Sequence, residues 1–331
     1  MQALQYRRPD KLRLREFPDP EPADDEILLE VAACGICGTD LHILAGEAPS
    51  ASPVILGHEF SGMVIRTGKQ VSGIKPGTMI AVDPNNYCGT CEYCHRGAVH
   101  LCRNIRPVGV GRNGGWAELC VVPAVQVHPV PEHLDPRLAA LAEPLSCIIH
   151  GWDRIAPVSC NRGVLVMGAG IIGLLWALFL RGNGLTDLHL TEPQPKRREI
   201  AHRLGFSCFS PGALYDSFDI IIDCSGSPSA IEQAFDHLKP GGKSLLFGIA
   251  PPDARISLAP FKIFQQEWTI LGSVINPFTF SRALALLPAL GIDPAELGIV
   301  TFPLAGYEQA LQAARTGAAT KVMFDLRHKN Q

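Results

Sequence analysis

The sequence has no marked excess of charge of either sign. Its 29 lysines and arginines nearly balance 32 aspartates and glutamates, so the formal net charge is -3 at pH 7. Acids and bases are mixed along the chain, which indicates neither a basic groove for nucleic acid nor a polybasic patch for a membrane surface. We therefore expect no nucleic-acid partner and no membrane partner.

The sequence also lacks the features of export and membrane insertion. Residues 1–26 are polar and charged, without the apolar core of a signal peptide. Residues 163–180 form an uncharged apolar run near the lower length limit of a membrane-spanning helix, but glycines inside it have a spacing that favours another interpretation. Internal repeats and low-complexity segments are missing too. We expect a globular, cytoplasmic protein.

Cysteine, in contrast, is plentiful. The chain has eleven cysteines, and an odd number without a secretion signal favours metal binding over disulfides. Four fall within fifteen residues, at Cys88, Cys91, Cys94 and Cys102. Four thiolates without a water ligand form a closed, structural zinc site, which would brace a lobe at residues 85–103 that has little core of its own. A zinc-ribbon nucleic-acid module is the rival interpretation, and the sequence pI of about 6.4 and the missing basic stripe count against it.

Six further cysteines stand in apolar or small-residue surroundings. We interpret them as small core residues: Cys34, Cys120, Cys147, Cys160, Cys208 and Cys224.

The apolar pattern predicts two domains in an α/β protein. Residues 1–147 contain short Val/Ile/Leu runs broken by Gly and Pro, which is typical of a β-rich, barrel-like domain. In residues 148–276 strand-like and helix-like segments alternate, which predicts a doubly wound parallel sheet covered on both faces. Residues 277–331 hold two helical patterns and a strand, are too short for a separate domain, and should complete the first one.

The glycines of the apolar run fit GxGxxG at Gly168, Gly170 and Gly173. The motif follows a predicted strand and opens a predicted helix, as in a dinucleotide-binding turn, where the three glycines permit the turn, the approach of the pyrophosphate and close packing. The helix N-terminus would supply N–H groups to the phosphates. The alternative is that these glycines serve helix–strand packing alone.

An acidic residue, Glu192, lies nineteen residues after Gly173, at the end of the next predicted strand. Its carboxylate can accept hydrogen bonds from both ribose hydroxyls and would repel a 2′-phosphate, so we predict NAD rather than NADP. The basic residues at 196–198 leave open a partial rescue of NADP binding.

Thiolate, imidazole and carboxylate groups are spread through the first domain at Cys37, His58, Glu59 and Glu143. These are the ligand types of a catalytic zinc site, which keeps one position for water or substrate. Taken singly, each has an ordinary structural explanation, as a core cysteine, a satisfied histidine or surface charges.

Together these segments resemble the zinc-dependent medium-chain dehydrogenases over nearly the whole chain. The order CGTDLH, GHEFSG, four-cysteine lobe, EPLS and GAGIIG matches the family, and is most similar to its polyol (sorbitol-type) branch. The resemblance implies a GroES-like catalytic domain, a Rossmann domain, and an active site between them. It also implies two zinc ions per chain, one catalytic and one structural, and NAD as hydride acceptor.

The resemblance further implies a role for each matching residue. Cys37, His58 and Glu59 would bind the catalytic zinc, Glu143 would ligate it or hold its water, and Asp40 would orient the ligand histidine. The implied proton route runs through Thr39 and His42. The implied dinucleotide contacts are Gly168, Gly170, Ile172, Gly173, Glu192, Arg197, Gly248, Ile249, Ser273 and Val274.

Three departures bear on the substrate. Sorbitol-type enzymes have a tyrosine where this chain has Ile43, and an Arg-Tyr pair where it has Ile275 and Asn276. These departures predict that the substrate is a smaller or less polar polyol, or a vicinal diol. The implied reaction is NAD-dependent oxidation of a polyol or secondary alcohol to a ketose or ketone by a homodimer or homotetramer. L-threonine and 2,3-butanediol are the alternative substrates, and a zinc- and NAD-binding protein without turnover is the alternative of another class.

Overall fold

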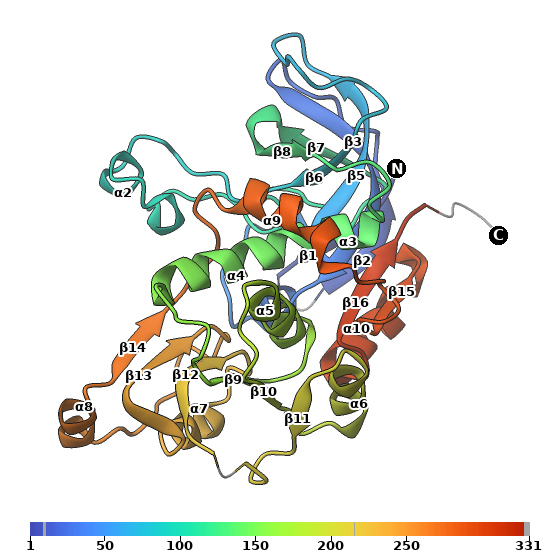
Figure 1. The fold of residues 1–331 in the computed structure, drawn as a ribbon. Helices are drawn as coiled ribbons and strands as arrows, with labels where there is room; N and C mark the ends of the chain where they lie inside the picture. Colours follow the sequence, from blue (N-terminus) through green and yellow to red (C-terminus); the bar gives the residue numbers. More distant parts are fainter. Residues whose placement is uncertain (9–10, 215, 328–331) are drawn as a thin grey trace. The chain divides into compact units, whose positions relative to one another are not determined.

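The computed structural model describes residues 1–8, 11–214 and 216–327, and the chain divides into two compact units (Figure 1). The first unit comprises Met1–Ser146, Asn276–Pro294 and Ile299–Gln331, and the second comprises Cys147–Ile275 and Ala295–Gly298. Each unit is built on its own sheets.

The first unit is centred on strand β3 (Glu26–Ile36), which pairs antiparallel with β5 (Phe60–Thr67), β7 (Leu119–Pro123) and β16 (Lys321–Asp325). The C-terminal strand therefore completes the sheet that the N-terminal segment begins. The other strands of this unit are β1 (Gln2–Arg7), β2 (Lys11–Glu16), β4 (Val54–Ile55), β6 (Met79–Val82), β8 (Val127–Pro129) and β15 (Ile299–Phe302).

Short helices connect these strands. They are α1 (Gly38–Ala45), α2 (Glu92–His95), α3 (Pro136–Ala140), α9 (Phe280–Leu286) and α10 (Tyr307–Thr316). Helix α4 (Ala142–Ile155) starts in the first unit and ends in the second.

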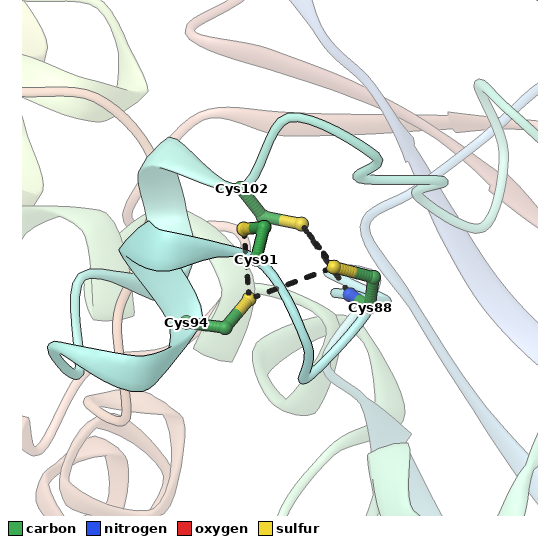
Figure 2. Close-up of side chains that lie close together, drawn as sticks. All are labelled: Cys88, Cys91, Cys94 and Cys102. Carbon is green, nitrogen blue, oxygen red and sulfur yellow. Dashed lines mark hydrogen bonds between the residues drawn. The ribbon is translucent and has the colours of Figure 1, made fainter.

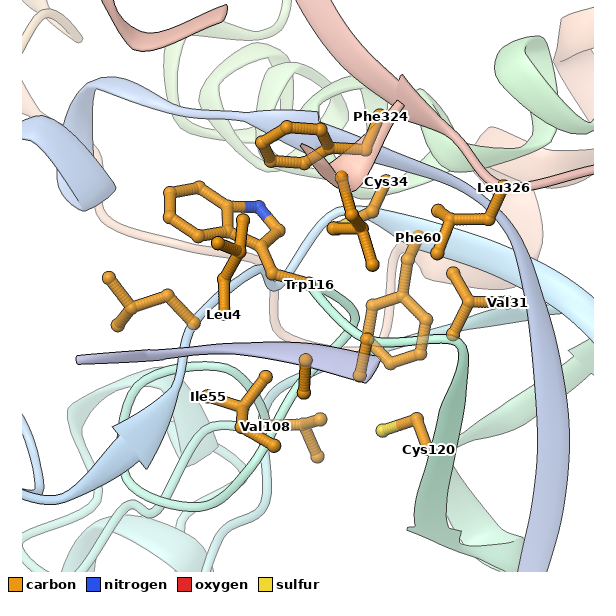
Figure 3. Packing of buried hydrophobic residues seen from close by; sticks show 14 of the residues in the cluster. Leu4, Val31, Cys34, Ile55, Phe60, Val108, Trp116, Cys120, Phe324 and Leu326 are labelled. Carbon is orange, nitrogen blue, oxygen red and sulfur yellow. The ribbon is translucent and has the colours of Figure 1, made fainter. Parts of the chain in front are cut away.

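Figure 3 shows part of the core of the first unit, around Trp116, Cys34 and Phe60. Trp116 is fully buried, meets Phe324 edge-on with ring centroids 5.5 Å apart, and donates its indole N–H to the Gly35 carbonyl at 3.3 Å. A buried Trp with a satisfied N–H both fills volume and fixes backbone position. This packing fixes the backbone two residues before Cys37.

The second unit is a six-stranded parallel sheet in the order β11-β10-β9-β12-β13-β14. This is the Rossmann order 3-2-1-4-5-6. All the strands are parallel, and the order in which successive strands are added to the sheet reverses between β9 and β12. The strands are β9 (Val164–Met167), β10 (Leu188–Thr191), β11 (Ser207–Phe209), β12 (Phe218–Asp223), β13 (Leu238–Leu246) and β14 (Thr269–Gly272). The helices are α5 (Ile171–Gly182), α6 (Pro195–Arg203), α7 (Pro228–Ala234) and α8 (Pro260–Gln266).

The apolar run at residues 163–180 forms β9 and most of α5 rather than one helix. Among the described residues, no helix has the length and apolar character needed to cross a membrane. Burial of α5 within the second unit accounts for its composition, because nearly all of its side chains between Ile171 and Leu180 are buried.

Candidate functional site

Strand pairing brings three potential metal ligands together in the first unit. Cys37 directly follows β3, whereas His58 and Glu59 directly precede β5. Since β3 and β5 run antiparallel with Cys34 opposite Phe60, the end of one strand lies beside the start of the other. One ligand atom from each of Cys37, His58 and Glu59 lies within 4.8 Å of the others. We call these three residues the metal group.

Asp40 lies beside the histidine of this group. It is fully buried; its Oδ2 accepts the Cys37 N–H at 2.8 Å and its Oδ1 lies 3.4 Å from His58 Nδ1. Burial alone would lower the pKa of His58, but the Asp40 carboxylate and Cys37 raise it well above its usual range. With Nδ1 turned to a carboxylate, Nε2 is the nitrogen available to a metal, which is the usual arrangement of zinc-bound histidines.

Glu59 has a partner that sequence reasoning missed. Its Oε2 forms an ion pair with Lys321 Nζ, and both residues are buried, with exposed fractions of 1% and 4%. Burial would lower the pKa of Lys321, but the Glu59 carboxylate raises it. The pair lies against Gly35, where an added Cβ would overlap Glu59 Oε2. A lysine inside the apolar strand TKVMFDL was the signal, because buried lysines are nearly always paired.

Glu143 lies in the first turn of α4 and is buried, outside the three-residue metal group. Burial raises the pKa of Glu143 to about 7; His58 opposes the shift and Glu59 adds to it. Glu143 therefore lies within electrostatic reach of the group. Its ligation of zinc stays a prediction.

The two residues of the predicted proton route lie on α1. Thr39 Oγ1 lies 3.7 Å from Cys37 Sγ, and His42 Nδ1 lies 2.6 Å from Glu47 Oε2 on a partly exposed face. Positions three apart are neighbours on a helix surface. The helix thus carries one hydroxyl at the metal group and one imidazole that reaches solvent.

The four clustered cysteines converge on one point (Figure 2). The Sγ atoms of Cys88 and Cys102 are 3.5 Å apart, those of Cys91 and Cys94 3.6 Å, and those of Cys88 and Cys94 4.0 Å. A zinc ion with four Zn–S bonds of about 2.3 Å requires sulfurs about 3.8 Å apart. The donor set and its spacing fit a tetrahedral zinc ion.

The close approach of these four thiols also favours a bound cation. Hydrogen bonds from Thr90 lower the pKa of Cys88 to about 5, whereas burial and the neighbouring Cys91 and Cys102 raise the pKa of Cys94 to about 12. Four thiolates this close cannot all ionise unless a positive charge compensates them. Of the two histidines in this lobe, His95 is exposed and His100 is half-buried.

In the second unit the carboxyl ends of the parallel strands align in one row. The last residues of β10, β9, β12, β13 and β14 are paired in register, from Thr191 to Gly272. The predicted cofactor residues directly follow these ends, where doubly wound sheets bind their ligands. Gly168 has φ +104°, and a Cβ at Gly173 would overlap the Gly168 carbonyl oxygen. The turn therefore requires glycine at both positions.

Glu192 is turned toward the glycine turn. Its Oε2 accepts the Ala169 N–H and its Oε1 accepts the Gln194 N–H, both at 2.9 Å. Arg197 Nη1 lies 4.0 Å from Glu192 Oε2. These residues line a cavity of about 390 Å³ together with Gly168, Gly170, Gly212 and Ser225, a volume within the range of small-molecule pockets.

The remaining predicted cofactor contacts follow β13 and β14 and open helix α5. Ile249 and Val274 are largely exposed, and Ile172 is half-buried in the first turn of α5. The sequence did not indicate a role for His150 at this place. Its Nδ1 lies 2.8 Å from the Ile275 carbonyl oxygen and 3.3 Å from Ser273 Oγ. It thereby fixes the segment that follows β14, including Ile275 at φ +43°.

A metal group with an oriented histidine, a four-thiolate lobe and a Rossmann sheet define the class of metal-dependent dehydrogenases. Residues 23–132 match the model of the alcohol dehydrogenase GroES-like domain, and residues 172–289 match that of the zinc-binding dehydrogenase. The chain belongs to the zinc-binding dehydrogenase family, whose members are oxidoreductases that use zinc and a nicotinamide dinucleotide.

Individual relatives cover almost the whole chain. It is 35% identical to D-altritol 5-dehydrogenase of Agrobacterium fabrum, with 92% of this chain and 93% of that protein covered. It is 31% identical to L-threonine 3-dehydrogenase of Saccharopolyspora erythraea, with 95% of each covered. A solved structure of a zinc-binding dehydrogenase from Sinorhizobium meliloti 1021, bound to NADP, is 35% identical, with a TM-score of 0.92 and 98% of each chain covered.

Proposed function

We propose that this chain oxidises a polyol or related secondary alcohol to a ketose or ketone with NAD+ as hydride acceptor, and catalyses the reverse reduction. The observation that carries the proposal is the metal group, with Cys37, His58 and Glu59 converging within 4.8 Å in a member of the zinc-binding dehydrogenase family. The similarity to an altritol dehydrogenase supports the substrate class.

The residues present fit a catalytic zinc ion. A thiol, a neutral imidazole nitrogen and a carboxylate are zinc donors, and the Asp40 carboxylate lies 3.4 Å from the other imidazole nitrogen. Zinc held there supplies a Lewis acid that lowers the pKa of a substrate hydroxyl group, and the nicotinamide supplies the hydride acceptor.

The chain's own residues would orient the substrate and move its proton. Glu143, whose pKa burial raises to about 7, can hold a proton or a water beside the metal group at neutral pH. Thr39 would accept the hydroxyl proton as it passes its own proton to a water molecule, and His42, hydrogen-bonded to Glu47, would release the proton to solvent.

We propose NAD as the preferred cofactor because Glu192 occupies the position where a 2′-phosphate would lie. Repulsion between the carboxylate and the phosphate disfavours NADP. The NADP-bound relative and the proximity of Arg197 make NADP+ a required arm of the test.

We further propose a cytoplasmic homodimer or homotetramer. All eleven cysteines are free, as expected in a reducing compartment. Strand β14 ends the sheet order of the second unit, and within the described residues no strand pairs with its outer edge. An open edge of this kind can continue into the sheet of a second copy.

The test is an NAD+ reduction screen, followed at 340 nm, over C3–C6 polyols, 2,3-butanediol and L-threonine, repeated with NADP+. We expect the highest kcat/KM with a polyol and NAD+. L-threonine is a second candidate because a threonine dehydrogenase is similar over 95% of the chain. Turnover of L-threonine alone would replace the polyol assignment, and zinc and NAD+ binding without turnover of any alcohol would indicate the non-catalytic alternative.

A further inference from the structure

A buried polar cluster in the first unit has no role in the mechanism above. Asp83 Oδ1 accepts the backbone N–H of Asn85 at 3.1 Å and the side-chain amides of Asn85 and Asn276 at 3.3 Å each. The Asn85 amide also donates to the Asn276 Oδ1. We call Asp83, Asn85 and Asn276 the amide cluster. It joins the turn after β6 to the segment that begins at residue 276.

The cluster retains hydrogen-bonding capacity. Asn85 and Asn276 are 9% and 3% exposed, and burial raises the pKa of Asp83 against the hydrogen bonds that it accepts. All the contacts of the Asp83 carboxylate fall on Oδ1, and no described residue donates a hydrogen bond to Asp83 Oδ2 or Asn85 Oδ1. Neither oxygen is one of the fully buried atoms without a partner, so both can be reached by a ligand's hydroxyl groups.

The segment that carries Asn276 also contacts the start of helix α4. Thr279, three residues after Asn276, donates its hydroxyl group to the Ser146 carbonyl oxygen at 2.7 Å, and Ser146 donates its own hydroxyl group to the Glu143 carbonyl oxygen at 2.6 Å. Glu143 is the residue of α4 that the resemblance places beside the catalytic zinc. A molecule with one hydroxyl group at the metal group would therefore extend toward the amide cluster.

An exposed aromatic pair flanks the cluster. Tyr87 follows Asn85 by two residues and Phe278 follows Asn276 by two, and their rings meet edge-on with centroids 6.0 Å apart. Their exposed fractions are 41% and 63%. Phe278 has φ +58°, an unfavourable conformation for a bulky side chain that is retained mostly at functional sites.

We propose that the amide cluster is the subsite for the distal hydroxyl groups of a linear polyol of five or six carbons, with Tyr87 and Phe278 packed against the C–H surface of its chain. This inference rests on the proposed function and assigns its substrate class. A site built to hydrogen-bond a hydroxyl group strongly rejects analogues that lack it, because its own polar groups are then left unpaired. The subsite therefore selects long polyols over short diols. This replaces the expectation of a smaller polyol or a vicinal diol that was drawn from Ile43, Ile275 and Asn276.

The test compares Asn85→Ala and Asn276→Ala with the matched control Asn86→Ala, in the same turn but outside the cluster. Each holoenzyme is assayed with xylitol, D-arabinitol and D-altritol, and with 2,3-butanediol as a substrate without distal hydroxyl groups. For both cluster variants we expect kcat/KM for the polyols to fall about tenfold or more, mainly through KM, as for the loss of one or two hydrogen bonds. The value for 2,3-butanediol should change less than about threefold, and Asn86→Ala should leave both unchanged.

Equal losses for polyols and diol would show that the cluster only braces the two segments, and would overturn the proposal. Asp83→Asn keeps an acceptor oxygen and covers the case in which an alanine variant fails to fold. A folded Asp83→Asn enzyme must retain the preference for polyols, and loss of that preference would also overturn the proposal. Wild-type enzyme that oxidises 2,3-butanediol with no gain for longer polyols refutes the subsite alone. Wild-type enzyme that oxidises no alcohol refutes the proposed function.

Discussion

The charged residues at the metal group are among the least exposed in the chain. Asp40, Glu59 and Lys321 are each at most 4% exposed, and His58 and Glu143 are each 7% exposed. Charges in such surroundings are retained only when they are paired or bind a metal. The sequence predicted the ligand types here, but it could not predict the Lys321 pairing, because β16 meets β3 only through long-range strand pairing.

Replacing Lys321 tests the importance of this pairing. Lys321→Met leaves Glu59 as an unpaired buried carboxylate, so we expect the free energy of unfolding of the zinc-free protein to fall by about 3–5 kcal/mol. Chemical denaturation measures it. The control is Lys239→Met, which removes a partly exposed ion pair with Asp219 and should cost less than about 1 kcal/mol. Similar losses in both variants would contradict the account.

Zinc binding at the metal group should depend on pH. His58 and Glu143 both have raised pKa values in the folded, zinc-free protein, so both hold protons that zinc must displace. Their contribution to stability is present at low pH and is lost as pH rises through the folded-state pKa values, which for Glu143 is a window from 4.5 to about 7. We expect zinc affinity, measured against a competing chelator, to increase steadily from about pH 5 to pH 8.

The Glu143→Gln variant provides the control for this measurement. It removes one titrating group without changing the shape of the side chain, so the pH dependence below about pH 7 should become shallower. A zinc affinity that is independent of pH in the wild type would show that these groups hold no protons in the zinc-free state.

Among the secondary-structure elements, local pattern decided which ones were predictable. Strand β9 is apolar throughout and β12 contains three consecutive isoleucines, and the alternation of such segments with helices predicted the parallel sheet. Helix α7 ends at Ala234, shortly before β13 begins at Leu238 and pairs with Phe218 across an irregular register. Helix α9 ends at Leu286 and is followed by a 3₁₀ turn that contains Pro288. Helix α8 was not predicted from the sequence.

The glycine turn makes a prediction for helix α5. In Gly173→Ala the new Cβ would overlap the Gly168 carbonyl oxygen, forcing the helix away from the turn. We expect NADH affinity, measured by fluorescence titration, to fall about tenfold or more, since the phosphate-binding N–H groups would be displaced.

Gly182→Ala on the same helix is the matched control. A Cβ at Gly182 meets no atom within 4 Å, so this change should preserve NADH affinity and leave stability equal or slightly higher. Unchanged NADH affinity in Gly173→Ala would mean that the turn does not bind the cofactor.

In the molecule as a whole, two different metal-binding groups lie in the first unit. The cysteine spacing made the lobe recognisable from sequence, and the three-residue metal group depended on its resemblance to a family. The sequence marked Asn276 as a position that bears on the substrate, but its pairing with Asp83 could not be predicted, because the two residues are far apart in the chain and share no motif.

The lobe should stabilise structure without taking part in chemistry. Helix α2 has no buried residue, so this segment depends on the metal for its fold. Cys91→Ser should therefore lower the Tm and release one zinc ion per chain. The control is Cys160→Ser, at a cysteine that is exposed rather than in the core as we predicted, and it should change neither quantity. A wild-type Tm in Cys91→Ser would refute the structural role.

The most direct test of the whole account is the zinc content of Cys37→Ser, measured by elemental analysis together with its NAD+ reduction rate and Tm. The account predicts two zinc ions per wild-type chain, and one in Cys37→Ser, with activity abolished and the Tm nearly unchanged. A single zinc ion in the wild type, or alcohol oxidation that survives the loss of Cys37, would contradict it.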